Sequence, residues 1–159
     1  MSDGVDELRD RIASGYEEIR ALLLQLRDRD LAAATPTGRP TWRALAALIQ
    51  SPLSDARAAT RLASGKAADP PLIQRGLDVI AAWRRRRIYS AATSCDVLTA
   101  WEQSFNTLFS CVNDISEAPP DETGADRASA RAEALAYLRD APARWQPYAD
   151  ELRAALAAR

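Results

Sequence analysis

The chemistry open to this chain is limited by a residue type that it lacks. None of its 159 residues is a histidine, which excludes nucleophile–base pairs of the Ser/His and Cys/His kinds and di-metal sites built on Glu-x-x-His. Its two thiols, Cys95 and Cys111, are too few for a disulfide framework or a four-thiolate zinc site. If both lie on one helix they are roughly 24 Å apart, too far for a disulfide. We therefore interpret both as core or near-core thiols.

Carboxylates and glycines supply no clearer catalytic or cofactor site. An all-carboxylate metal site would have to draw on Glu17, Glu18, Glu102, Glu117, Glu133 and Glu151. Glu17 and Glu18 fall on a polar helix face, and Glu102 lies beside an apolar stripe rather than in it. The six glycines are scattered singly, so no phosphate-binding loop is present. These residues predict no catalytic group, no metal and no cofactor.

The most conspicuous charge run is Arg84, Arg85, Arg86 and Arg87. Four consecutive residues cover about 300° of a helix, so they cannot form a one-sided phosphate-binding stripe. Overall, 21 basic and 22 acidic residues leave a net charge of −1, which provides no field to attract nucleic acid. We interpret the run as a solvated helix end and predict no nucleic-acid partner.

The elements that must position these side chains are predicted to be helices. Apolar residues recur at spacings of three and four in residues 3–31, 41–64, 93–116 and the stretch after 124, with a shorter stripe in 70–87. Thr41 is the expected cap of the second helix, and Pro52 must kink it or restart it after Ser51. A further break is expected at Pro142. No segment alternates like a strand, so the fold class is all-α.

The length of the chain predicts one domain spanning residues 1–159. Four major apolar stripes, with one long crossover between the second and third, are typical of a helical bundle. The N-terminal segment has charges throughout and does not read as a signal peptide, and the apolar runs are too short to cross a bilayer. We expect a cytoplasmic protein with no membrane partner.

Two segments resemble the DinB-like superfamily, which includes relatives of the thiol-dependent maleylpyruvate isomerases. The resemblance rests on Trp42 at the start of the second helix, the Ala-Leu-Ile turn at 47–49, and the Leu-Ala-Ser-Gly-Lys ending at 62–66. It also rests on Asp-Val-Leu at 96–98, and it covers roughly residues 40–116. It implies a four-helix bundle in up-up-down-down order, often dimeric, with a short extra helix in the crossover.

The resemblance also implies a divalent metal held by three histidines from the second and last helices. The corresponding positions of this chain are Ala47 or Gln50 for the first ligand, and Arg144 and Tyr148 for the other two. Because none of these is a good metal ligand and a guanidinium repels a cation, we expect a metal-free pocket. Arg144 would favour a small anionic ligand there instead.

Three functions follow from this sequence. The first is a metal-free DinB-like bundle that acts as a binding or interaction protein. It would have an inter-helix pocket and could form a homodimer. The alternative is an enzyme of the thiol-dependent transferase or isomerase type, in which Tyr148, Arg144 and Gln50 replace the metal. Nucleic-acid binding through the arginine run is the third.

Overall fold

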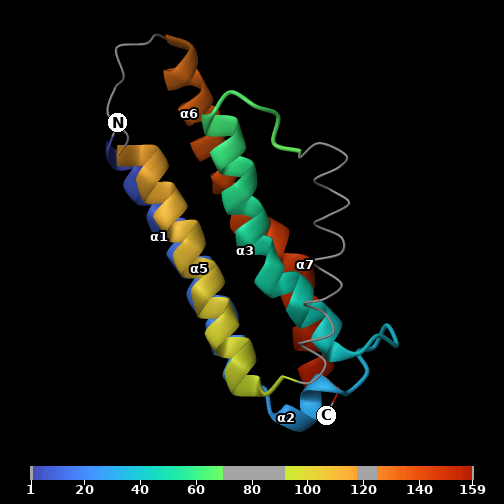
Figure 1. Cartoon of the computed structure of the whole chain (residues 1–159). Coiled ribbons are helices and arrows are strands. Elements are labelled where there is room, and N and C mark those ends of the chain that lie inside the picture. Colours follow the sequence, from blue (N-terminus) through green and yellow to red (C-terminus); the bar gives the residue numbers. More distant parts are fainter. Residues whose placement is uncertain (1, 70–91, 118–124, 159) are drawn as a thin grey trace.

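The protein folds into a bundle of long helices, and the predicted all-α class is confirmed (Figure 1). The computed structural model describes residues 2–69, 92–117 and 125–158. Its helices are α1 (Ser2–Leu23), α2 (Asp28–Leu31), α3 (Thr41–Ala63), α5 (Ser94–Glu117), α6 (Ala125–Arg139) and α7 (Ala141–Ala157). The short helix expected in 70–87 and the arginine run within it lie outside the described residues.

The helix directions follow from side chains that meet across the bundle. On α1 and α5, Arg9 meets Asn113 while Arg20 meets Glu102, so these two helices run in opposite directions. Helices α3 and α7 also run in opposite directions, because Asp55 meets Arg144 while Thr35, just before α3, meets Glu151. On α1 and α7, Gly15 approaches Trp145 and Glu18 pairs with Arg153, so these two helices are parallel.

The order of directions is therefore up-down-down-up, which differs from the up-up-down-down order that the resemblance implies (Figure 1). The connection between α1 and α3, residues 24–40, contains α2 and reverses the direction of the chain. The long crossover falls between α3 and α5, the two consecutive major helices that run in the same direction.

The core forms where the predicted apolar stripes face one another. The largest fully buried side chains include Trp101 on α5 and Trp145 on α7, whose rings meet edge to face with centroids 5.5 Å apart. Tyr16 of α1 stacks on the other side of Trp101. The stripe expected to dominate the core, on α5, contributes Val97, Trp101, Leu108, Val112 and Ile115 as buried residues. The recurrence of apolar residues about every 3.6 positions was thus sufficient to identify this helix and its inner face.

Helix boundaries differ from the predicted ones in two places. The first predicted helix is divided into α1 and α2, and Asp30 of α2 accepts a hydrogen bond from the Arg27 amide at 2.7 Å. Thr41 does not cap α3: its hydroxyl donates to the Ala33 carbonyl at 2.9 Å, and Pro40 occupies the cap position. Both differences come from polar bonds that tie the connecting segment together.

Helix α3 continues without interruption through Pro52. The Ser51 hydroxyl donates to the Ala47 carbonyl one turn back, at 2.9 Å, beside the point where the proline lacks an amide hydrogen. The break expected near Pro142 is present, because α6 ends at Arg139 and α7 begins at Ala141 with a proline in its first turn.

Helices α1 and α7 approach closely at Gly15. A Cβ added there would lie 3.0 Å from Cβ of Pro142 and 3.4 Å from a ring carbon of Trp145. The glycine therefore allows α1 to lie against the start of α7, beneath the stacked aromatic rings. This contact fixes the position of Trp145 along the axis of α1.

A buried carboxylate cluster between α3, α6 and α7

The most distinctive polar site in the described structure is centred on Asp55, which lies on α3 and has 3% of its surface exposed. Its Oδ1 atom accepts hydrogen bonds from Arg144 Nε at 2.8 Å and from the Tyr137 hydroxyl at 3.4 Å. Its Oδ2 atom accepts a hydrogen bond from Trp145 Nε1 at 2.9 Å. We call these four residues, Asp55, Tyr137, Arg144 and Trp145, the Asp55 cluster.

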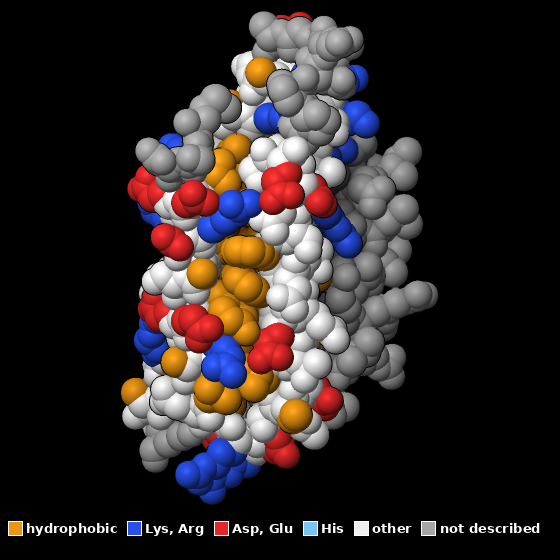
Figure 2. Space-filling model, turned by 90° about the vertical axis from the view of Figure 1, so that its left-hand side faces the viewer, with side chains coloured by type: hydrophobic (Ala, Val, Ile, Leu, Met, Phe, Trp, Pro, Cys, Tyr) orange, Lys and Arg blue, Asp and Glu red, His pale blue; other side chains and the backbone are white. Residues whose placement is uncertain are grey.

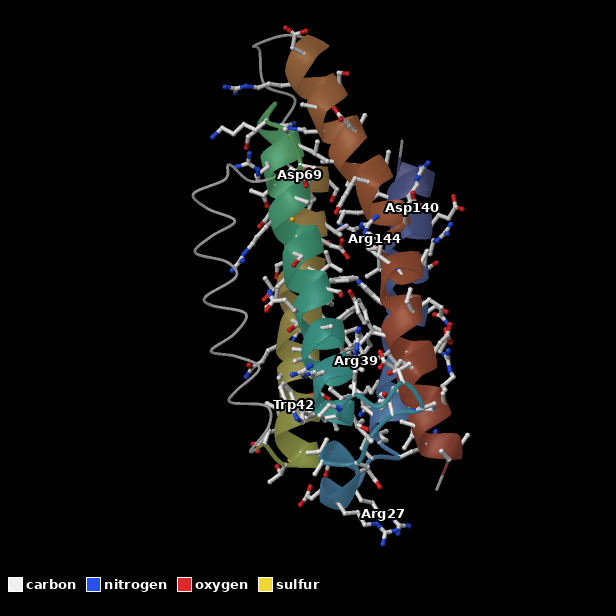
Figure 3. All side chains as sticks on the ribbon, turned by 90° about the vertical axis from the view of Figure 1, so that its right-hand side faces the viewer. Arg27, Arg39, Trp42, Asp69, Asp140 and Arg144 are labelled. Carbon is white, nitrogen blue, oxygen red and sulfur yellow. The ribbon has the colours of Figure 1, made fainter. Side chains whose placement is uncertain are left out.

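Arg144 connects the members of this cluster. In Figure 3 its side chain lies between α7 and α3. Its guanidinium carbon lies 4.0 Å from the centre of the Tyr137 ring, and one terminal nitrogen donates to the Tyr137 carbonyl at 3.0 Å. This carbonyl is near the end of α6, where few intrahelical donors are available. Arg144 thus ties α7 to both α3 and the end of α6.

The electrostatics of Asp55 are set by opposing effects. Burial raises the pKa of the Asp55 carboxyl above its usual value, and this effect outweighs the hydrogen bond from Trp145 and the charge of Arg144, which both lower it. A carboxylate with a raised pKa can serve as a general acid or base when substrate reaches it. Here both oxygens are occupied by donors from the chain itself, so the arrangement holds three helices together.

The four positions suggested by the resemblance lie on two helices that pack against each other, Ala47 and Gln50 on α3 and Arg144 and Tyr148 on α7. All four are partly buried. Of the four, Arg144 has the interactions already described, and no hydrogen bond within the described chain joins it to Gln50 or Tyr148. Tyr148 packs against the apolar core. The structure therefore places these positions on two helices that pack against each other, while the contacts of Arg144 are made with other residues.

Asp55, the partner of Arg144, was not among the residues singled out from the sequence, although its position carries a signal. It falls at helical spacing with Leu45, Leu48, Pro52, Ala59 and Leu62, all of them buried. An aspartate at a buried position of an apolar stripe needs a cation or several donors. The stripe of α3 could therefore have pointed to Asp55, but only the fold identifies Arg144 and Trp145 as its partners.

The residues present do not fit the metal that the resemblance implies. Within the described ranges, no group of three or more His, Cys, Asp or Glu side chains is placed to hold a metal ion. Asp55 contacts the implied ligand position Arg144 and is bound to its guanidinium. A cation placed there would face Arg144 directly.

One indole in the core lacks a hydrogen-bond partner. Trp101 Nε1 is buried and, among the atoms that the structure describes, no acceptor bonds to it. The indole of Trp145, packed against it, has a carboxylate acceptor. An unpaired buried donor lowers stability by about 1–3 kcal/mol, so these two tryptophans differ in energy although both are fully buried.

The two cysteines occupy different environments on α5. Cys111 is buried, as expected, and its Sγ lies 3.4 Å from the Thr60 hydroxyl and from the Ala56 carbonyl. Burial raises the pKa of the Cys111 thiol, which makes it less reactive. Cys95 is exposed, so its predicted place in or near the core is wrong. It lies in the first turn of α5, where the helix presents its outer side to solvent.

None of the helices in the described part of the chain is long and apolar enough to span a membrane. In the comparisons with known proteins, no family model, no curated protein and no solved structure matches this chain. These comparisons do not support the DinB-like resemblance, which stays a prediction from sequence.

Proposed function

We propose that this chain is a binding or interaction protein that contacts its partner through the outer face of α1 and α5. The observation that carries the proposal is a band of apolar side chains along this face, crossed at two heights by basic side chains (Figure 2). We call it the α1–α5 stripe and define it by five residues of the two helices and the turn after α1: Tyr16, Leu24, Leu98, Phe105 and Phe109.

The stripe is held together by aromatic contacts between the two helices. The rings of Tyr16 and Phe105 stack with centroids 4.0 Å apart, and Phe109 lies next to Phe105 at 5.5 Å. These three side chains are partly buried, and Leu24 is the most exposed large apolar residue described, at 57%. Leu24 follows directly after α1, one helical turn beyond Arg20, to whose carbonyl its amide bonds.

Charged side chains flank the stripe (Figure 2). Arg20 bridges from α1 to Glu102 on α5 at 3.6 Å. About three turns away, Arg9 bridges from α1 to Asn113 at 2.9 Å and to Glu117 at 3.4 Å. Each arginine also pairs with an acid on its own helix, Asp6 or Glu17.

An apolar band with charged residues around it is typical of a protein contact surface. Aromatic residues and arginine are enriched in the centres of such surfaces, and contiguous apolar surface is costly to leave in water. Partial exposure of three aromatic rings in a row costs free energy that a partner would recover on binding. The stripe therefore supports an interaction function more directly than any other surface described.

The interface of α3 and α7 gives weaker support for the enzyme alternative. A small anion, the ligand expected for Arg144, would have to compete with the Asp55 carboxylate already bound to it. The DinB-like pocket and its ligand remain part of the sequence-based hypothesis.

Photo-crosslinking in the producing cell tests the proposal. A benzophenone amino acid is placed at Phe109, within the stripe, and in a matched variant at Gln103, an exposed residue of the same helix. We expect a discrete crosslinked product from position 109 and none from position 103. Identical product patterns from the two positions would contradict the interaction function of this face.

A further inference from the structure

We propose that the occupant of the α1–α5 stripe is a second copy of this chain, related to the first by a two-fold axis that runs parallel to the helices. This inference rests on the proposed function, since it names the partner for the same surface. It is carried by the distribution of charge along the two helices that border the stripe.

The charges that bridge the two helices at two heights along the stripe are divided between α1 and α5. Both bridging cations, Arg9 and Arg20, belong to α1. Both bridging acids, Glu102 and Glu117, belong to α5. Arg20 lies at the level of Glu102, and Arg9 at the level of Glu117, because α1 and α5 are antiparallel.

Consider a two-fold axis that is parallel to the helices and lies between the two facing surfaces. It exchanges the sides on which α1 and α5 lie, and it leaves the position of each residue along the helix axis unchanged. Helix α1 of one copy then lies opposite α5 of the other copy. At one height Arg20 of each copy faces Glu102 of the other, and at the other height Arg9 faces Glu117. Every bridge within a chain is thus repeated between chains, and the aromatic rows meet at the centre.

The other face-to-face two-fold axis, perpendicular to the helices, gives the opposite result. It places α1 on α1 and inverts the levels, so that Arg9 faces Arg20 and Glu102 faces Glu117. Like charges would then meet at both heights, which disfavours that arrangement. The charge pattern of the monomer therefore selects one symmetry axis over the other.

The bridging side chains keep enough exposure to contact a second copy. The exposed fractions of the Arg9, Arg20, Glu102 and Glu117 side chains are 28%, 38%, 41% and 73%. Helices of 22 and 24 residues offer a face roughly 35 Å long and about 20 Å wide, which is close to the lower limit for a stable protein interface. We therefore expect a dissociation constant on the order of micromolar.

Sedimentation velocity of the purified full chain, from about 1 to about 200 µM, measures this association. Wild type is expected to shift from monomer to dimer over this range. Leu24→Glu and Phe109→Asp each place a charge in the stripe and should weaken the dimer at least about tenfold. Leu24 is largely exposed, so its replacement leaves the fold intact even if Phe109→Asp does not. Gln103→Asp, on the same helix as Phe109, is the matched control and should associate like wild type.

A charge exchange tests the symmetry axis. Arg20→Glu and Glu102→Arg should each fail to form homodimers, because like charges then face each other across the axis. Mixed in equal amounts, the two variants should form a heterodimer, since the glutamate introduced into one chain faces the arginine introduced into the other. In the perpendicular arrangement, Arg20→Glu alone would instead strengthen the homodimer.

Three results would overturn the inference: a folded wild type that stays monomeric over the whole range, a dimer that survives Leu24→Glu, and a pair of charge variants that does not recover association on mixing. The crosslinking experiment separates this inference from the proposed function. A specific product with another protein at position 109, together with a monomeric purified chain, would keep the interaction function and exclude the self-association.

Discussion

The Asp55 cluster, and the α1–α5 stripe together with the charges that bridge its two helices, both combine arginine, carboxylate and aromatic rings, yet they differ in burial. In the cluster, Arg144 approaches Asp55 to 2.8 Å, and the side chain of Asp55 is 5% exposed. In the stripe, Arg20 lies 3.6 Å from Glu102, whose side chain is 41% exposed. The same residue types therefore meet in a nearly dry site in one place and in a solvated site in the other.

This difference in burial decides what each region can do. A buried carboxylate has to obtain all its donors from the chain, so the Asp55 cluster contributes to the stability and register of α3, α6 and α7. A solvated ion pair contributes little to stability and can rearrange at low cost. The stripe is therefore the region that can exchange water for a partner, and the cluster is the region in which a substitution costs the most stability.

The largest effect is expected from removal of the buried carboxylate. Asp55→Ala leaves the Arg144 guanidinium and the Trp145 N–H without their acceptor, and we expect a loss of about 3–5 kcal/mol in the free energy of unfolding. Urea denaturation followed by circular dichroism measures it. Glu133→Ala, an exposed acid on α6, is the control and should change stability by less than about 0.5 kcal/mol. Equal effects of the two substitutions would show that the cluster is not structural.

The two buried tryptophans give the next comparison. Trp145→Phe removes a hydrogen bond to Asp55, whereas Trp101→Phe removes a donor that has no partner in the described part of the chain. Both changes remove similar apolar volume, so the Trp145 variant should be less stable by about 1–3 kcal/mol. Thermal and urea melts of both variants measure the difference. A Trp101 variant as unstable as the Trp145 variant would indicate that Trp101 Nε1 has an acceptor in solution.

The contact between the two regions is tested at Gly15. Gly15→Ala places a methyl group against the rigid ring of Pro142 at 3.0 Å, and we expect a net loss of about 1 kcal/mol after the gain in helix propensity. Gly4→Ala on the same helix meets only the end of the Arg139 side chain, at 3.4 Å, and should be neutral or slightly stabilising. A stabilising Gly15→Ala would mean that α7 shifts away from α1 without cost.

The pH dependence of stability should differ in sign between buried and exposed carboxylates. Burial raises the pKa of Asp55 above 3.8, so its contribution to stability is largest below that pH and falls as the pH rises through the folded-state pKa. Hydrogen bonds from Ser94 lower the pKa of Asp28, and those from Thr93 lower the pKa of Asp96. The stabilisation from Asp28 and Asp96 is present above 3.8 and is lost as the pH falls below it.

Denaturation curves across pH 3–8 for wild type, Asp55→Asn and the double variant Asp28→Asn with Asp96→Asn separate these contributions. Relative to Asp55→Asn, wild type should lose stability as the pH rises above about 4. Relative to the double variant, wild type should lose stability as the pH falls below about 4. Parallel curves for wild type and Asp55→Asn would show that the Asp55 pKa is not raised.

The smallest expected effect is that of a chelator. Because one of the implied metal positions is Arg144, whose guanidinium repels a cation and is already bound to Asp55, we expect no stoichiometric zinc, nickel or iron in protein purified without chelator. A strong chelator should leave the melting temperature unchanged. Elemental analysis and melts with and without the chelator measure this, and one metal per chain would point to ligands supplied by residues outside the described ranges or by a second copy.

The sequence alone was sufficient for the helices and for most of their inner faces. Trp101, Leu108 and Val112 recur at helical spacing and are fully buried, because an amphipathic helix must place its apolar stripe inward whatever its neighbours are. The break before α7 could be predicted for an equally local reason, since Pro142 cannot continue a preceding helix. Such features depend on residues within a few turns of one another.

The order of helix directions, the partners of Asp55 and the assembly of the α1–α5 stripe from two helices were decided by the tertiary structure. Asp55 and Arg144 are 89 positions apart, and their meeting depends on how α3 and α7 cross in space. Tyr16 and Phe105 fall within the apolar stripes predicted for two separate helices, and only the antiparallel packing of α1 and α5 joins them in one partly exposed row. Spacing along one helix determines which face is apolar, whereas the choice between a buried core contact and a surface open to a partner depends on how many neighbouring helices cover that face.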